Sequence, residues 1–182
     1  MAQEWADYSG ACAVLVAESR VGAWHGMFTA VDAGDPDFVL SGQAWRLDDE
    51  MDFENPTTDY DRACAVDGVA AHLLEGRGFA ALVIVLELDM LTWWQDEKVI
   101  VNGDTLPSRA NLERVRWEPA VTVELSEGRH ILMNAADHGG DPSKGTHFHP
   151  ELAPGTYRVE WGQYGWEPDD PALVLWRFVS VL

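Results

Sequence analysis

Residues 121–133 read VTVELSEGRHILM and give the clearest indication of the fold. From Val121 to Leu125, apolar residues at odd positions alternate with polar residues at even positions, which is the period of a half-buried strand. Ser126, Glu127 and Gly128 then form a turn-like tripeptide before a second apolar run at 130–133. This pattern predicts a β-hairpin with a three-residue loop containing glycine.

The rest of the C-terminal third continues the β pattern. Between 157 and 161, apolar and charged residues alternate, so Tyr157, Val159 and Trp161 share one strand face. In the run 172–181, residues on both faces are largely apolar, which predicts a strand inside a sheet. Residues 79–88 are continuously rich in Val, Ile and Leu and predict a second central strand.

Shorter elements complete the expected organisation. Strands are predicted at 12–16, 98–102 and 38–47, the last interrupted by Gly42, and Ser108 is expected to cap a short helix over 108–114. A further helical turn is possible at 21–27. With few helices and no strand–helix alternation, the sequence predicts a mainly β single domain spanning 1–182, with two packed, mostly antiparallel sheets (a β-sandwich) and one or two short helices. An α+β fold is the alternative.

Charge excludes several classes of partner. The chain has 31 Asp and Glu against 12 Lys and Arg, a formal net charge of -19. Nucleic acid and anionic lipid bind through basic side chains, so neither is expected as a partner. The longest apolar run, 79–86, is far shorter than the ~20 residues that cross a bilayer. No export signal is recognised, so we expect a cytoplasmic protein in which Cys12 and Cys64 are small, buried, reduced side chains.

Histidines gather in one region and raise the possibility of a metal site. His138 is followed by His147 and His149, and the last two would share one face of a strand. The cupin pattern, however, has a Glu three or four residues after the second His, where this chain has Ala153 and Pro154. A surface loop rich in Gly, Asp and Pro explains the region as well. We therefore assign no metal, and a metal-binding protein or metalloenzyme using this cluster is kept as the alternative function.

The acids concentrate in residues 48–61, a run that contains no Lys or Arg. A solubilising loop is one interpretation of this run. The other is a negative surface that steers a basic protein partner, because complementary charge raises association rates. The residues of this candidate partner surface are Asp48, Asp49, Glu50, Asp52, Glu54, Asp59 and Asp61.

The end of this run resembles a known family. The stretch Asp59-Tyr60-Asp61-Arg62-Ala63-Cys64 is similar to one in the immunity protein 21 family of bacterial polymorphic toxin systems. Residues 23–26, 78–86, 91–99, 132–136, 152–159 and 172–178 resemble other family segments in the same order. The chain departs from the family at His25, where an Arg is usual, and at 87–90, where a Gly-Asp-Glu-Pro-like turn is expected.

The resemblance implies an inhibitor and not an enzyme. Such a protein would bind the toxin domain encoded beside it in the cytoplasm and occlude its active site, with no cofactor and no catalytic group. The absence of glycine-rich nucleotide loops, Gly-x-Ser-x-Gly and His-Glu-x-x-His from the sequence agrees with this expectation. Within the motif, Arg62 has two possible roles: an ion-pair clasp with the neighbouring carboxylates Asp59 and Asp61, or a direct contact with the partner.

Overall fold

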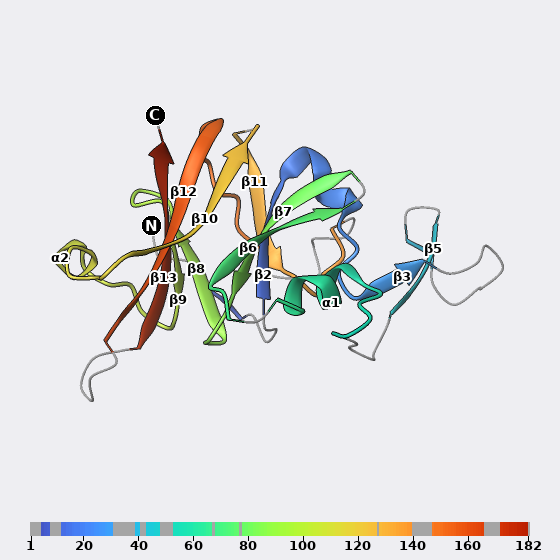
Figure 1. The fold of residues 1–182 in the computed structure, drawn as a ribbon, viewed down its shortest axis with the longest axis horizontal. Helices are drawn as coiled ribbons and strands as arrows, with labels where there is room; N and C mark the ends of the chain where they lie inside the picture. Colours follow the sequence, from blue (N-terminus) through green and yellow to red (C-terminus); the bar gives the residue numbers. More distant parts are fainter. Residues whose placement is uncertain are drawn as a thin grey trace.

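The chain folds into a mainly β structure with two large antiparallel sheets packed together (Figure 1). The computed structural model describes residues 5–7, 12–30, 39–40, 43–47, 53–66, 68–76, 78–126, 128–139, 147–165 and 172–181. Within these ranges, three short helices and a small third sheet accompany the two large sheets.

The larger sheet has six strands in the order β1-β8-β9-β13-β12-β10, and all neighbours are antiparallel. Its strands are β1 (Ala6–Asp7), β8 (Met90–Trp94), β9 (Val99–Asn102), β10 (Glu118–Leu125), β12 (Gly155–Tyr164) and β13 (Leu173–Val181). The predicted central position of the last strand is confirmed, because β13 lies between β9 and β12. The long β12–β13 pairing runs from Thr156 opposite Val181 to Tyr164 opposite Leu173.

The second sheet has four strands in the order β11-β2-β7-β6. They are β2 (Cys12–Ala17), β6 (Ala71–Gly76), β7 (Phe79–Val85) and β11 (His130–Asn134). The predicted central strand at 79–88 is confirmed as β7, which ends at Val85. A separate small sheet is formed by β3 (Phe28–Ala30), β4 (Val39–Leu40) and β5 (Gln43–Leu47). The strand predicted over 38–47 is thus two antiparallel strands, and Gly42, the expected interruption, lies outside the described residues.

One apolar core lies between the two large sheets. The four-stranded sheet contributes Leu15, Leu82 and Leu132, and the six-stranded sheet contributes Ile100 and Trp176, with other buried neighbours. Burial of such side chains contributes roughly 1.5–3 kcal/mol each. This shared core holds the two sheets against each other.

Both sheets are also covered on their outer faces, and this explains why central strands have apolar residues at successive positions. Trp24, Tyr60 and Phe79 pack on the outer face of the four-stranded sheet, beneath helices η1 (Glu18–Ala23) and α1 (Asp59–Cys64). On the far side of the six-stranded sheet, Leu173 and Leu175 pack against the segment containing α2 (Arg109–Leu112). A strand buried on both faces needs apolar residues at odd and even positions alike.

The predicted hairpin over 121–133 is wrong, although both of its strands exist. β10 pairs with β12 in the six-stranded sheet, whereas β11 pairs with β2 in the four-stranded sheet. The segment between them therefore carries the chain from one sheet to the other. Two strands that are adjacent in sequence and joined by a short loop satisfy the hairpin pattern locally, but here each finds its hydrogen-bonding partner elsewhere.

The helices agree only partly with the sequence. The cap predicted at Ser108 is confirmed, with its side chain accepting the Asn111 N–H at 3.1 Å, but the helix ends early at Leu112. The turn expected at 21–27 is a 3-10 helix at Glu18–Ala23. Helix α1 lies at Asp59–Cys64, where the sequence analysis predicts no helix. Its signal was the spacing of Thr58 and Asp61, which matches a capping box.

Candidate functional site

Residues Asp59–Cys64, the motif singled out in the sequence, form helix α1, and Thr58 is its N-cap. Thr58 precedes the helix and its Oγ1 accepts a hydrogen bond from the Asp61 backbone N–H at 3.0 Å. In return, the Asp61 carboxylate accepts the Thr58 N–H at 3.2 Å. This reciprocal pair satisfies donors that a helix start leaves open. Asp61 is 2% exposed, so its carboxylate serves the first turn of the helix and not the surface.

Asp59 is also buried, with 4% of its surface exposed. Its Oδ2 accepts the backbone N–H of His25 at 2.9 Å, and its Oδ1 forms an ion pair with Arg62. Arg62 in addition donates from Nε to the Thr58 carbonyl at 3.4 Å. Of the two roles considered for Arg62, the ion-pair clasp is therefore present, and Asp59 supplies its carboxylate.

The remaining motif residues face the four-stranded sheet. Tyr60 and Ala63 are buried in the outer core, and the Tyr60 N–H donates to the Gly26 carbonyl at 3.0 Å. Gly26 has a φ of 60°, and a Cβ there would collide with the Ala136 carbonyl, so this turn requires glycine. Burial lowers the pKa of His25, and the nearby Asp59 partly opposes that effect. The motif thus fixes α1 to the turn at 24–26.

The acidic run is divided by the fold. Glu54 lies on the surface just before the helix. The carboxylates of Asp59 and Asp61 are hydrogen-bonded inside, so the predicted acidic contact surface does not include them as solvent-facing groups. The other members of the run lie outside the described residues: Asp48, Asp49, Glu50 and Asp52.

The histidine cluster of the alternative function is not gathered into one ligand set. His138 is buried, and its ring centroid lies 5.4 Å from that of His25 and 5.5 Å from that of Phe28. His147 and His149 contact each other edge to face, with centroids 5.0 Å apart. Within the described residues, no three His, Cys, Asp or Glu side chains are placed to hold a metal ion. Residues 140–146 lie outside that part of the chain.

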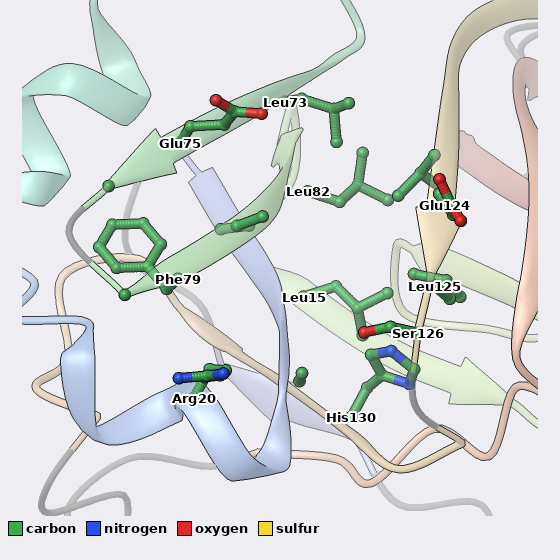
Figure 2. A pocket seen from close by; sticks show the side chains of 16 residues that line it. Leu15, Arg20, Leu73, Glu75, Phe79, Leu82, Glu124, Leu125, Ser126 and His130 are labelled. Atoms are coloured by element: carbon green, nitrogen blue, oxygen red, sulfur yellow. The ribbon is translucent and has the colours of Figure 1, made fainter.

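A cleft of about 490 Å³ opens between the two large sheets, where their edge strands β6 and β10 approach each other (Figure 2). Apolar side chains form much of its wall, among them Leu15, Leu73, Phe79, Leu82 and Leu125. This cleft was not predicted from the sequence, because β6 was not recognised and β10 was assigned to a hairpin with β11.

Polar and charged side chains line the cleft at two places. Glu75 from β6 and Glu124 from β10 lie in the upper half of Figure 2, whereas Arg20 from η1 and His130 from β11 lie in the lower half. Glu75, Glu124 and Arg20 are exposed, and the side chain of none of the three makes a hydrogen bond or ion pair with another described residue. Apolar walls beside solvated charges suit a long amphipathic side chain such as that of lysine or arginine.

Exposed apolar residues concentrate in the segment that contains α1 and leads into β6. Of the five large apolar residues that are exposed in the described part of the chain, four lie within residues 53–73: Phe53, Val66, Val69 and Leu73. The fifth is Val181 near the end of β13. Leu73 also lines the cleft, so the exposed segment and the cleft share a residue on β6. Exposed apolar side chains that form one contiguous patch are typical of contact surfaces.

Two further observations bear on function. None of the helices in the described ranges is long and apolar enough to span a membrane. Comparisons of the chain with protein-family models, with curated proteins and with solved structures found no match.

Proposed function

We propose that this chain is an immunity-type inhibitor that binds and occludes a basic toxin domain in the cytoplasm. The carrying observation is the concentration of exposed Phe53, Val66, Val69 and Leu73 in residues 53–73 of a protein with a net charge of -19. Protein interfaces combine an apolar centre with a polar rim, and complementary charge guides their encounter. The resemblance of residues 59–64 to the immunity protein 21 family supports the same function.

The proposed contact surface differs from the one expected from the acidic run. It consists of residues 53–54, the exposed residues Val66, Gly68 and Val69 after α1, and the β6 side of the cleft with Leu73 and Glu75. Helix α1 supports this surface from within, through the Asp59 and Asp61 contacts described above. A basic side chain of the partner would lay its alkyl stem along the leucines of the cleft and place its charge near Glu75 and Glu124.

The function is tested by expressing the product of the neighbouring open reading frame with and without this chain. The neighbour is expected to stop growth alone, to be tolerated when both are present, and to copurify with this chain. A neighbour that is harmless on its own, or that does not associate, would contradict the proposed function.

The surface is tested separately with two matched substitutions in the copurifying pair. Val69→Asp introduces a charge at an exposed apolar position of the proposed surface, and is expected to weaken binding at least about tenfold. Val181→Asp makes the same change at a comparably exposed position elsewhere and is the control. Equal affinities for the two variants, measured by titration calorimetry, would remove residues 53–73 from the interface and leave the inhibitor function standing.

A further inference from the structure

Cys12 and Cys64 lie against each other although they are 52 positions apart in the chain. Their Sγ atoms are 3.4 Å apart, and both are free thiols. Cys12 is buried on β2 at the outer face of the four-stranded sheet, whereas Cys64 is the last residue of α1 and is only partly buried. The pair is therefore the point at which the end of α1 meets the sheet.

The two sulfurs are within reach of a covalent bond. A disulfide has an S–S distance of about 2.05 Å, so an approach of roughly 1.4 Å would join them. The chain after Cys64 continues into exposed Val66 and Gly68, and Gly68 has a φ of 73° with open space around it. The chain that follows Cys64 is therefore exposed and leaves room for a small shift of this residue toward β2.

The two thiols differ in exposure and in the direction of their pKa shifts. The hydrogen bond between them lowers the pKa of Cys64, and burial of Cys64 opposes this effect in part. The same hydrogen bond, together with burial, raises the pKa of Cys12. The thiolate is the attacking form in thiol–disulfide exchange. Cys64 is thus the accessible nucleophile, and Cys12 is the neighbouring thiol that can resolve an intermediate formed on it.

We propose that Cys12 and Cys64 form a dithiol modification site that small-molecule disulfides such as oxidised glutathione oxidise reversibly. The Cys64 thiolate attacks one sulfur of the reagent and releases one glutathione thiol, which leaves a mixed disulfide on Cys64. Cys12 then attacks the Cys64 Sγ, and the second glutathione leaves as a thiol. The two cysteines together lose two protons and two electrons. The glutathione disulfide takes up these two protons and two electrons and becomes two glutathione thiols.

The bond would fasten α1 to the four-stranded sheet. A cross-link between residues 52 positions apart restricts the unfolded chain and stabilises the folded protein. For a chain of this size we expect the melting temperature to rise by about 5–10 °C on oxidation. This inference does not depend on the proposed inhibitor function, because it concerns the chain by itself.

The test uses the full chain, fully reduced and then equilibrated with mixtures of oxidised and reduced glutathione. We expect intact mass spectrometry to show a monomer two hydrogens lighter, with both thiols protected from alkylation and a Cys12–Cys64 peptide after digestion. The rise in melting temperature should disappear when excess thiol is added. A stable glutathione adduct on Cys64, a disulfide-linked dimer, or two thiols that remain free in excess oxidised glutathione would each overturn the proposal.

Cys64→Ser is the matched variant, because it replaces the partly buried thiol at the end of α1 and leaves the Cys12 side chain in the core. Its melting temperature should be the same with and without oxidised glutathione. The peptide mapping of the unaltered chain decides the question even if this variant folds poorly. A melting temperature that rises equally in Cys64→Ser and in the unaltered chain would show that the stabilisation does not come from this bond.

Discussion

Five described carboxylates form two groups with opposite surroundings. Asp59, Asp61 and Glu160 are buried and hydrogen-bonded, whereas Glu75 and Glu124 stand exposed on the edge strands β6 and β10 with no hydrogen-bonding partner among the described residues. The first group includes residues that the sequence marks as a contact surface. The residues of the second group, Glu75 and Glu124, belong to none of the candidate sites named from the sequence.

The difference teaches that the place of an acid in the fold decides its role. Glu160 lies on β12, inside the six-stranded sheet, where Arg158 and Arg177 each approach it to 2.6 Å. The guanidinium of Arg177 also lies 4.3 Å from the centre of the Trp117 ring. Acids in such surroundings stabilise the fold, and acids on an open edge remain available to a partner. Substitutions in each group can break or sharpen this distinction.

The largest effect is expected for Glu160→Ala. Removing the carboxylate leaves Arg158 and Arg177 without their shared partner, and both guanidinium groups remain partly solvated. We expect a loss of about 3 kcal/mol in the free energy of unfolding, measured by urea denaturation at pH 7. Glu124→Ala, in the neighbouring strand β10, is the control and should stay within about 0.5 kcal/mol of the unaltered protein.

Glu160 also predicts how stability depends on pH. Burial alone would raise its pKa, but the hydrogen bonds from Arg177 and Arg158 outweigh burial and hold the pKa below its usual value of 4.5. The unfolded chain therefore binds a proton at Glu160 at a pH where the folded chain does not. This contribution is complete above about pH 4.5 and is lost as the pH falls toward the folded pKa. Glu160→Gln should flatten this part of a stability–pH curve, and an unchanged slope would contradict the assignment.

Asp59→Ala should lower the free energy of unfolding by about 2 kcal/mol, somewhat less than Glu160→Ala. The substitution removes the acceptor of the His25 N–H and the ion-pair partner of Arg62, and it loosens α1 from the turn at 24–26. Asp89→Ala, an exposed acid in the turn before β8, is the control for loss of one negative charge. If the two variants unfold at the same urea concentration, Asp59 does not anchor the helix.

Asp61→Ala tests the capping box alone and should lower the free energy of unfolding by about 1 kcal/mol. The backbone N–H groups of Thr57 and Thr58 donate hydrogen bonds to the Asp61 carboxylate at 3.4 and 3.2 Å. The substitution leaves both groups without this acceptor. Asp61→Asn keeps an acceptor oxygen at the same place and should recover most of the loss. A loss of equal size in both variants would indicate that the charge matters more than the cap.

The elements predicted from the sequence are those whose pattern is set by the chain itself. β7 and β13 were recognised because burial on both faces requires a continuous apolar run, and the start of α2 because Ser108 caps it. The pairing of the strands was not predicted, because it is decided by contacts between residues far apart in the chain. β10 and β11 have a hairpin pattern and nevertheless pair with β12 and β2.

The candidate site was harder to predict for the same reason. The sequence located the run that contains Asp59 and Asp61, but burial of these carboxylates depends on α1 packing against the turn at 24–26. The cleft is formed by β6 and β10, which are 42 or more positions apart and belong to different sheets. No local pattern connects Glu75 with Glu124, so only the fold brings them to one opening.

The smallest effect on stability is expected for the double variant Glu75→Gln, Glu124→Gln, whose free energy of unfolding should stay within about 0.5 kcal/mol of that of the unaltered protein.

Two roles can account for these exposed charges. Charged residues on edge strands prevent edge-to-edge pairing between copies, and acids beside an apolar cleft can receive a basic partner. Light scattering and stopped-flow association with the copurifying neighbour separate the two. Docking predicts slower association with a weaker dependence on salt and an unchanged monomer, because fewer charges guide the encounter. Aggregation with an unaltered association rate would instead assign Glu75 and Glu124 to protection of the sheet edges, and would move the partner surface toward residues 53–69.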